Sequence, residues 1–119
     1  MLQASSILVV DDSISARHCV RKAVAAVYPE ARISEAKNAD EAEKVFDDAK
    51  PELGILDMNM PGRSGLELAE ALLKRGIAIH LVLCTAGIQK RVENRAAILG
   101  IPIVDKPVSI EKLRAVLDR

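Results

Sequence analysis

Aromatic residues are nearly absent from this sequence of 119 residues, which contains one Tyr, one Phe and no Trp. A hydrophobic core must therefore be aliphatic, and a site that stacks on nucleic-acid bases or sugar rings is disfavoured. Net charge is absent as well, because 17 basic side chains balance 17 acidic ones. The sequence lacks the positive field that attracts nucleic acids, so we expect no nucleic-acid binding by this domain.

Long apolar runs and closely spaced cysteines are also missing. The aliphatic runs, such as residues 7–10 and 81–84, are far shorter than the roughly 20 residues that span a bilayer. The N-terminal segment MLQASS contains neither the basic nor the apolar part of a secretory signal. Cys19 and Cys84 lie far apart in the sequence, and we interpret each as a small buried residue in a reducing compartment. These features predict a cytoplasmic domain without membrane insertion.

Aliphatic segments alternate with amphipathic ones along the whole chain. Strands are predicted at residues 6–10, 31–36, 53–56, 79–84 and 101–104, each followed by a helical pattern. Segment 31–36 alternates like a half-exposed edge strand, whereas the others are aliphatic and indicate a parallel sheet covered on both faces. Five such units are too few for an eight-stranded barrel. We therefore predict an α/β fold with an open, doubly wound sheet, as one domain over residues 1–119.

The helices carry their own start signals and inward faces. Asn38 with Glu41, and Ser64 with Glu67, have the spacing of capping boxes. The residues expected to face the core include Ile88, Val92, Ala96 and Leu99 in the fourth helix and Ile110, Leu113 and Leu117 in the last helix.

Polar side chains follow the predicted strands at the points where they end. Asp11 and Asp12 follow the first strand, Asp57 the third, Thr85 the fourth and Lys106 the fifth. In an open parallel sheet, the carboxyl ends of the strands line the ligand crevice. Polar residues begin loops in any α/β protein, but this explains one or two of these positions better than all five. We therefore expect three carboxylates, a hydroxyl and an ammonium group to share one pocket.

This set of side chains favours phosphoryl chemistry. Three close carboxylates repel one another unless a cation is present, and hard oxygen ligands in a small open site favour Mg²⁺. Lys106 and Thr85 would hold a tetrahedral phosphoryl group from the other side. Asp57, on the central third strand, is the best candidate for a nucleophile that forms an aspartyl phosphate. The sequence contains no GxxxxGK[ST] phosphate loop, which disfavours a nucleotide site.

The sequence resembles the receiver domain of two-component response regulators over essentially its whole length. The resemblance rests on LVVDD at 8–12, ILDMNMPGRSGLEL at 55–68, LCTAG at 83–87 and DKP at 105–107. It implies a flavodoxin-like (βα)5 fold with strand order 2-1-3-4-5. It also implies a switch of a histidine-to-aspartate phosphorelay, activated by phosphorylation. Such a domain is not an enzyme with its own substrate, although it transfers and hydrolyses the aspartyl phosphate.

The resemblance implies a role for each acidic residue of the site. Asp57 is implied as the phosphoacceptor and as one ligand of Mg²⁺. Asp12 is implied as a direct ligand of the metal, and Asp11 as a ligand acting largely through water. Asn59, two residues after the acceptor, would offer its backbone carbonyl to the same ion.

Other positions follow or depart from the family pattern. Thr85 is implied as the switch hydroxyl that bonds the phosphoryl oxygen, and Lys106 as the cation that pairs with it, with a cis peptide before Pro107. Ile103 stands where many receivers carry Tyr or Phe as a rotamer switch, which questions the usual coupling of that ring to the threonine. Glu52 stands where the family often has Asp, and we expect it to be a surface variant.

The resemblance further implies two kinds of protein partner. A histidine kinase or phosphotransfer protein would be the phosphodonor. A downstream protein would bind the face of the fourth helix, fifth strand and fifth helix, where Lys90, Arg91 and Arg95 form a positive patch. The domain is expected either to stand alone, as chemotaxis-type receivers do, or to belong to a longer regulator with an effector domain.

Two other functions stay open at this point. One is a degenerate receiver that only binds proteins, which the intact set of site residues argues against. The other is a phosphatase or phosphomutase that uses an aspartyl phosphate. Those enzymes need a second Asp two residues after the nucleophile, where this sequence has Asn59, and they usually need a cap domain for which 119 residues leave no room.

Overall fold

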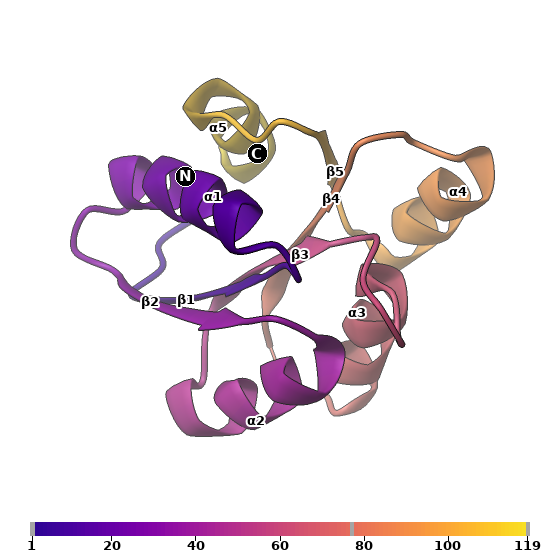
Figure 1. Cartoon of the computed structure of the whole chain (residues 1–119), viewed down its shortest axis with the longest axis horizontal. Coiled ribbons are helices and arrows are strands. Elements are labelled where there is room, and N and C mark those ends of the chain that lie inside the picture. Colours follow the sequence, from indigo (N-terminus) through magenta and orange to yellow (C-terminus); the bar gives the residue numbers. More distant parts are fainter. Residues whose placement is uncertain (1, 77, 119) are drawn as a thin grey trace.

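A parallel sheet covered by helices forms the centre of the molecule (Figure 1). The computed structural model describes residues 2–76 and 78–118. Within these residues the strand order is β2-β1-β3-β4-β5, and every neighbouring pair is parallel. This order confirms the predicted flavodoxin-like α/β fold. The strands are β1 (Ser6–Val10), β2 (Arg32–Ala36), β3 (Leu53–Asp57), β4 (His80–Thr85) and β5 (Ile103–Asp105).

Helices cover the sheet on both faces, with α1 and α5 on one face and α2 and α3 on the other (Figure 1). None of the helices in the described ranges is both long and apolar enough to cross a membrane. The helices are α1 (Ile14–Val27), α2 (Ala39–Ala49), α3 (Gly65–Lys74), α4 (Lys90–Leu99) and α5 (Ile110–Leu117).

Strand β1 shows why the central strands are continuously aliphatic. Successive side chains of a strand point to opposite faces of the sheet. Ile7 and Val9 enter the core beneath α1 and α5, while Leu8 and Val10 enter the core beneath α2, α3 and α4. All four side chains are almost fully buried. A strand buried on both faces therefore has no polar position until it ends, at the acidic pair.

Side-chain caps begin four of the helices, at Ser13, Asn38, Ser64 and Ser109, and two of these were predicted as capping boxes. Ser64 and Glu67 form the predicted capping box, with each side chain bonded to the backbone N–H of the other residue. Asn38 and Glu41 form only half of one. The Asn38 side chain accepts from the Glu41 N–H at 2.8 Å, but the Glu41 carboxylate accepts from the N–H of Lys37, one residue earlier. The second bond of the capping box thus comes from the N–H of Lys37, one residue before the cap, instead of from the Asn38 N–H.

Three apolar residues that were predicted to be buried are exposed. Ile88 is 45% exposed because α4 begins two residues later, after Gln89, which makes no side-chain cap. Ile110 is 38% exposed at the first position of α5. Cys19 is exposed because the buried stripe of α1 passes through its neighbour Val20 instead.

Strand β5 is shorter at its start than predicted. It begins at Ile103, because Pro102 has no N–H with which to extend the ladder. Pro102 only accepts, through its carbonyl, a hydrogen bond from the Leu83 N–H at 3.0 Å. Ile101 is nevertheless buried, and its N–H donates to the Ala96 carbonyl at the end of α4.

Candidate functional site

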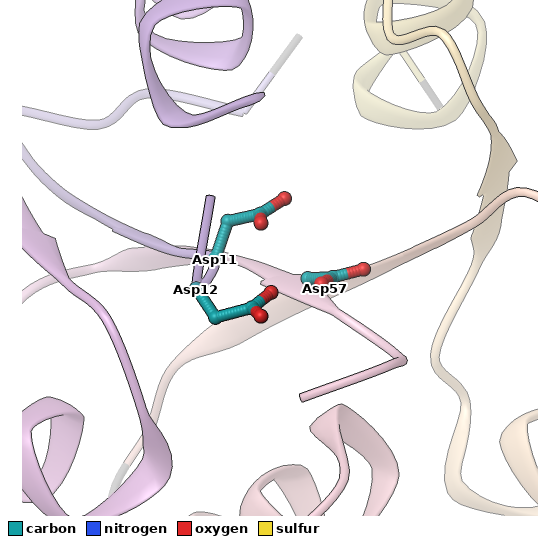
Figure 2. A group of neighbouring side chains, drawn as sticks. All are labelled: Asp11, Asp12 and Asp57. Carbon is teal, nitrogen blue, oxygen red and sulfur yellow. The ribbon is translucent and has the colours of Figure 1, made fainter. Parts of the chain in front are cut away.

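The three predicted carboxylates gather at the carboxyl ends of β1 and β3. One oxygen from each of Asp11, Asp12 and Asp57 lies within 4.8 Å of the other two. Figure 2 shows the three side chains extending into the same space. Asp11 and Asp57 are buried, whereas Asp12 is exposed on the open side of the group. The pairing of β1 with β3 brings them together, as the predicted strand order requires.

Lys106 bridges the two buried carboxylates. Its Nζ donates to Asp11 Oδ2 at 3.0 Å and lies 2.9 Å from Asp57 Oδ1. The Lys106–Pro107 peptide is cis, as the resemblance implied, and the Lys106 N–H donates to the Thr85 carbonyl at 2.9 Å. The ammonium group therefore enters the site from β5, opposite the acidic pair.

The charges in this group shift one another's protonation. Burial raises the pKa of the Asp57 carboxyl, and the bond to Lys106 opposes this rise without cancelling it. Burial acts to lower the pKa of the Lys106 ammonium, but the bonds to Asp57 and Asp11 outweigh burial and raise that pKa above its ordinary value. The lysine therefore stays charged beside the carboxylates.

The oxygen donors of the site fit a hard divalent cation. Three carboxylates lie within reach of one ion, and a single ammonium group leaves negative charge for a cation to neutralise. Asp12 offers an exposed carboxylate, as a partly hydrated ion requires. Asn59, the fourth predicted ligand, is exposed two residues after Asp57, and its N–H donates to Asp57 Oδ1 at 3.4 Å. The donor set suits Mg²⁺, which keeps several of its waters.

Thr85 ends the strand beside β3 and bonds to its own loop. It ends β4, one residue after Cys84, the register partner of Asp57, and it is buried. Its hydroxyl donates to the Gly87 carbonyl at 3.1 Å. The hydroxyl therefore has to change partner before it can bond to a group on Asp57.

Cys84 lies beside this group as a buried thiol. It is buried on β4, as predicted, and burial raises the pKa of its thiol to about 12. A thiol with that pKa stays protonated and is a poor nucleophile near neutral pH.

Helix α3 begins in direct contact with the backbone of Asp57. A Cβ atom added at Gly65 would clash with the Asp57 carbonyl oxygen, so any side chain there would force the backbone to shift. The Gly65 N–H donates to the Met58 carbonyl at 3.0 Å, and the Met58 N–H donates to the Cys84 carbonyl at 2.8 Å. The chain on both sides of the loop after Asp57 is therefore closely held.

Sequence patterns did not indicate Arg17 as a site residue. Its Nη1 donates to the Asp11 carbonyl at 2.7 Å, and its Nε donates to Glu35 on β2 at 3.2 Å. The side chain is only 15% exposed. It fixes the β1–α1 turn, which carries the acidic pair, to the neighbouring strand. A bond to a backbone carbonyl leaves no residue pattern, so helical periodicity alone assigns Arg17 to the surface.

The predicted positive patch on α4 is largely neutralised. Lys90 lies 3.4 Å from Glu93, and Arg95 lies 3.3 Å from Glu70 on α3. Within the described part of the chain, Arg91 is the exposed member of the patch for which no ion pair is found. The surface therefore carries less positive charge than the sequence suggests.

Comparisons with known proteins agree on one family. The model of the response regulator receiver domain matches residues 7–118. The chain is 32% identical over 121 residues to the phosphate regulon transcriptional regulatory protein PhoB of Pseudomonas aeruginosa, covering 96% of this chain and 52% of PhoB. It is 31% identical over 80 residues to the chemotaxis protein CheY of Listeria monocytogenes, covering 67% of this chain and 66% of CheY. The chain thus spans about half the length of PhoB.

Solved structures give the same result for the fold. Chemotaxis protein CheY4 of Vibrio cholerae superimposes with a TM-score of 0.84 at 24% identity, covering 98% of both chains. The signal receiver domain of NarL from Mycobacterium tuberculosis superimposes with a TM-score of 0.83 at 23% identity, covering 98% of this chain and 96% of that domain. At such identities these likenesses establish the fold alone. The family match over residues 7–118 shows that the chain belongs to the receiver domains of two-component response regulators.

Proposed function

We propose that residues 1–119 form one receiver domain, a signalling switch that phosphorylation of Asp57 controls. The observation that carries this proposal is the meeting of Asp57 with two more carboxylates and the Lys106 ammonium at one edge of the sheet. The phosphodonor is a phosphohistidine of a histidine kinase or phosphotransfer protein. Both cysteines are free thiols, which supports a reducing, cytoplasmic location.

Asp57 supplies the nucleophile in this proposal. One of its carboxylate oxygens forms a bond to the donor's phosphorus. The P–N bond to the donor imidazole then breaks, and its electron pair returns to the nitrogen. Attack of water on the same phosphorus later restores the carboxylate and releases inorganic phosphate, which gives the domain an intrinsic autodephosphorylation. These reactions act on the domain itself and need no separate substrate.

Asp11, Asp12 and Asp57, together with the Asn59 carbonyl, would hold Mg²⁺. The bound ion would supply the positive charge that lets an anionic donor approach three carboxylates. Asp12 is exposed to an incoming ion. Asp11 is held in place by Lys106 and by the Ser13 N–H, which donates to it at 2.9 Å. This division supports direct ligation by Asp12 and ligation through water by Asp11.

Lys106 and Thr85 would hold the phosphoryl group after transfer. Lys106 Nζ lies 2.9 Å from Asp57 Oδ1 and so stays within reach of a phosphoryl oxygen on that carboxylate. The Thr85 hydroxyl would leave the Gly87 carbonyl and bond to the phosphoryl group instead. This exchange of partners would draw residues 86 and 87 inward and shift the start of α4.

The output would leave through α4, β5 and α5. Ile103 is β-branched with restricted χ1 rotation, so it can follow Thr85 only partly. We therefore assign the change to the backbone of residues 86–92. A downstream protein, or an effector domain of the same protein, would bind the face formed by α4, β5 and α5, and no nucleic acid would bind to this domain.

Mapping of the phosphorylated residue tests the proposal. The protein is incubated with acetyl phosphate and Mg²⁺, and the added mass is located by peptide. We expect it on Asp57, and we expect it to vanish in excess chelator and in Asp57→Asn. Asp48→Asn, which removes an exposed carboxylate of α2, is the matched control and should be labelled normally. Labelling that persists in Asp57→Asn or in chelator would contradict the proposal.

The roles of Lys106 and Thr85 are tested on the phosphorylated protein. Lys106→Ala and Thr85→Ala should fold but change their amide spectra less than the wild type on phosphorylation. Lys106→Arg should not restore the response, because a planar guanidinium replaces a compact charge. Spectral changes as large as in the wild type would rule out these roles.

A further inference from the structure

Arg63 ties the β3–α3 loop to helix α2. Its Nη2 lies 2.8 Å from Asp40 Oδ1 and 2.5 Å from Glu43 Oε2. Arg63 and Glu43 are each about one-third exposed, and the two hydrogen bonds to α2 raise the pKa of the guanidinium. Within the described ranges, these are, besides the bond from the Asn59 N–H to Asp57 on β3, the side-chain hydrogen bonds that join residues 58–63 to a helix or strand. Arg63 thus joins the carboxyl-terminal part of the loop to α2, while Met58 and Met60 pack against the core.

This loop carries the proposed carbonyl ligand of the metal. Its two ends are fixed by the backbone bonds of Met58 and Gly65. Between these ends, Asn59 is exposed, and Gly62 adopts a φ of 78°, a conformation that favours glycine. Residues 59–62 belong to no helix or strand. The half-buried Met60 packs against the core, and Arg63 is the next charged side chain after the ligand that binds another element.

Arg63 also lines the hollow that opens beside the acidic group. This hollow has a volume of about 690 Å³. Asp12 lies on its wall together with Arg63, Gly62 and residues at the start of α2. The hollow is therefore lined both by Asp12, the exposed ligand proposed for the metal, and by loop residues that the ion pairs to α2 hold in place.

We propose that Arg63 is a positioning residue for Mg²⁺ binding. The inference rests on the proposed function, because it assumes that the site binds this ion. By fixing the loop on α2, Arg63 places the Asn59 carbonyl at a set distance from Asp12 before the ion arrives. Less conformational freedom then has to be lost on binding, so the metal binds more tightly than it would to a free loop.

Charge alone predicts the opposite effect of removing Arg63. A guanidinium beside the site repels a divalent cation, so Arg63→Gln should tighten Mg²⁺ binding if only charge matters. If Arg63 positions the loop, the same substitution should weaken binding. The direction of the change in Mg²⁺ affinity therefore separates the two explanations.

The experiment titrates the metal-free protein with Mg²⁺ and follows binding by amide NMR. We expect Arg63→Gln to raise the dissociation constant about two- to five-fold, as expected for loss of a partly exposed ion pair. Arg63→Lys keeps the charge but replaces the planar guanidinium with a shorter ammonium side chain, so its dissociation constant should lie between those of the wild type and Arg63→Gln. Arg75→Gln is the matched control, because it breaks an ion pair to Asp47 of α2 from the far end of α3. Its Mg²⁺ affinity should equal that of the wild type.

A second measurement needs no metal. In metal-free Arg63→Gln, amide hydrogen exchange should become faster at residues 59, 60 and 62, with α3 protected as in the wild type. Equal or tighter Mg²⁺ binding by Arg63→Gln, or unchanged exchange in this loop, would overturn the inference. Failure of the wild type itself to bind Mg²⁺ would instead overturn the proposed function.

Discussion

Two loops leave the sheet beside Asp57, and they are built in opposite ways. The β3–α3 loop, residues 58–64, ends in a capping box, meets the close contact at Gly65 and is tied to α2 by Arg63. The β4–α4 loop, residues 86–89, is exposed along its whole length. It ends at Gln89, which gives α4 no side-chain cap. One loop is held at several points, and the other is held at few.

The difference separates a part that has to stay in place from a part that can move. Phosphoryl transfer and metal binding require ligands at fixed positions. A conformational signal requires an element of low local stability. Helix α4 meets that requirement, because Val92 and Ala96 are its buried residues and an ion pair from Arg95 joins it to α3. We therefore expect the response to phosphorylation to follow the β4–α4 loop.

The spectral response to a phosphoryl mimic should show this contrast most strongly. Beryllium fluoride added to the Mg²⁺-loaded protein should shift the amides of residues 86–92 far more than those of residues 59–63. The methyl signals of Ile103 should report no change of rotamer, because the side chain is β-branched. Amide and methyl NMR before and after addition is the measurement. A rotamer change at Ile103, with no shift of the amides of residues 86–92, would contradict the assignment of the response to the β4–α4 loop.

Two glycine substitutions compare the loops by stability. Gly65→Ala should lower the free energy of unfolding by about 1–3 kcal/mol, as overpacking does, because the new Cβ meets the Asp57 carbonyl and the Leu83 side chain. Gly87→Ala meets no atom within 4 Å and should be neutral or stabilise by about 0.4–1 kcal/mol. Denaturant unfolding of both variants measures the difference. Equal losses would mean that the β4–α4 loop is as closely packed as the β3–α3 loop.

Removing the cap of one helix and adding a cap to another should change the free energy of unfolding by smaller amounts, in opposite directions. Ser64→Ala removes the cap of α3 and should cost about 1 kcal/mol. Gln89→Ser offers α4 a cap that it lacks and should stabilise by about 0.5–1 kcal/mol. The same variant should also reduce the shifts of residues 86–92 on addition of the mimic. A full-sized response from a more stable Gln89→Ser protein would show that the missing cap is unrelated to signalling.

The smallest effect is expected at the amino end of β3, away from both loops. Glu52, predicted as a surface variant, is exposed but accepts bonds from the Ser5 hydroxyl at 2.7 Å and from the Ser5 and Ser6 N–H groups. The bond from the Ser5 hydroxyl, together with the N–H bonds, lowers the pKa of Glu52. Because the folded-state pKa is the lower one, the stabilisation is present above the unfolded-state pKa. It is lost as pH falls through the folded-state value.

Glu52→Gln should therefore reduce stability at about pH 6 and do so less at about pH 3, on either side of the ordinary glutamate pKa of about 4.3. Unfolding measured at the two pH values checks this, with Glu30→Gln, an exposed glutamate outside the helices and strands, as control. The amides of both loops should be unaffected. A stability difference independent of pH would show that the carboxylate charge is irrelevant there.

The sequence was sufficient to predict the fold and that three carboxylates and the Lys106 ammonium lie together. After Ser6, which begins β1, the strands β1 and β3 contain no polar residue before their carboxyl ends, so Asp11 and Asp57 stand out from their neighbours. The strand order then places them together. Thr85 and Lys106 follow by the same rule. The rule is that a polar side chain follows each aliphatic strand, and the alternation of aliphatic strands with amphipathic helices is visible in a single sequence.

Contacts between surface side chains and distant backbone could not be predicted in that way. Arg17 and Arg63 read as ordinary charged residues, because their partners are a carbonyl or carboxylates on other elements. Helix boundaries caused the remaining errors. Ile88 and Ile110 fit the apolar period, yet one precedes its helix and the other begins its helix, so neither reaches the core.

The bridge formed by Lys106 has a consequence for folding. Its ammonium group acts as an internal counterion for Asp11 and Asp57, at 3.0 Å and 2.9 Å. The chain can therefore bring these buried acids together without first recruiting an ion from solution, unlike small metal-dependent domains whose folding requires the metal. Mg²⁺ would then add stability only by mass action, about 2.7 kcal/mol at a hundred-fold excess over its dissociation constant. Folding of this domain would then not depend on the supply of Mg²⁺.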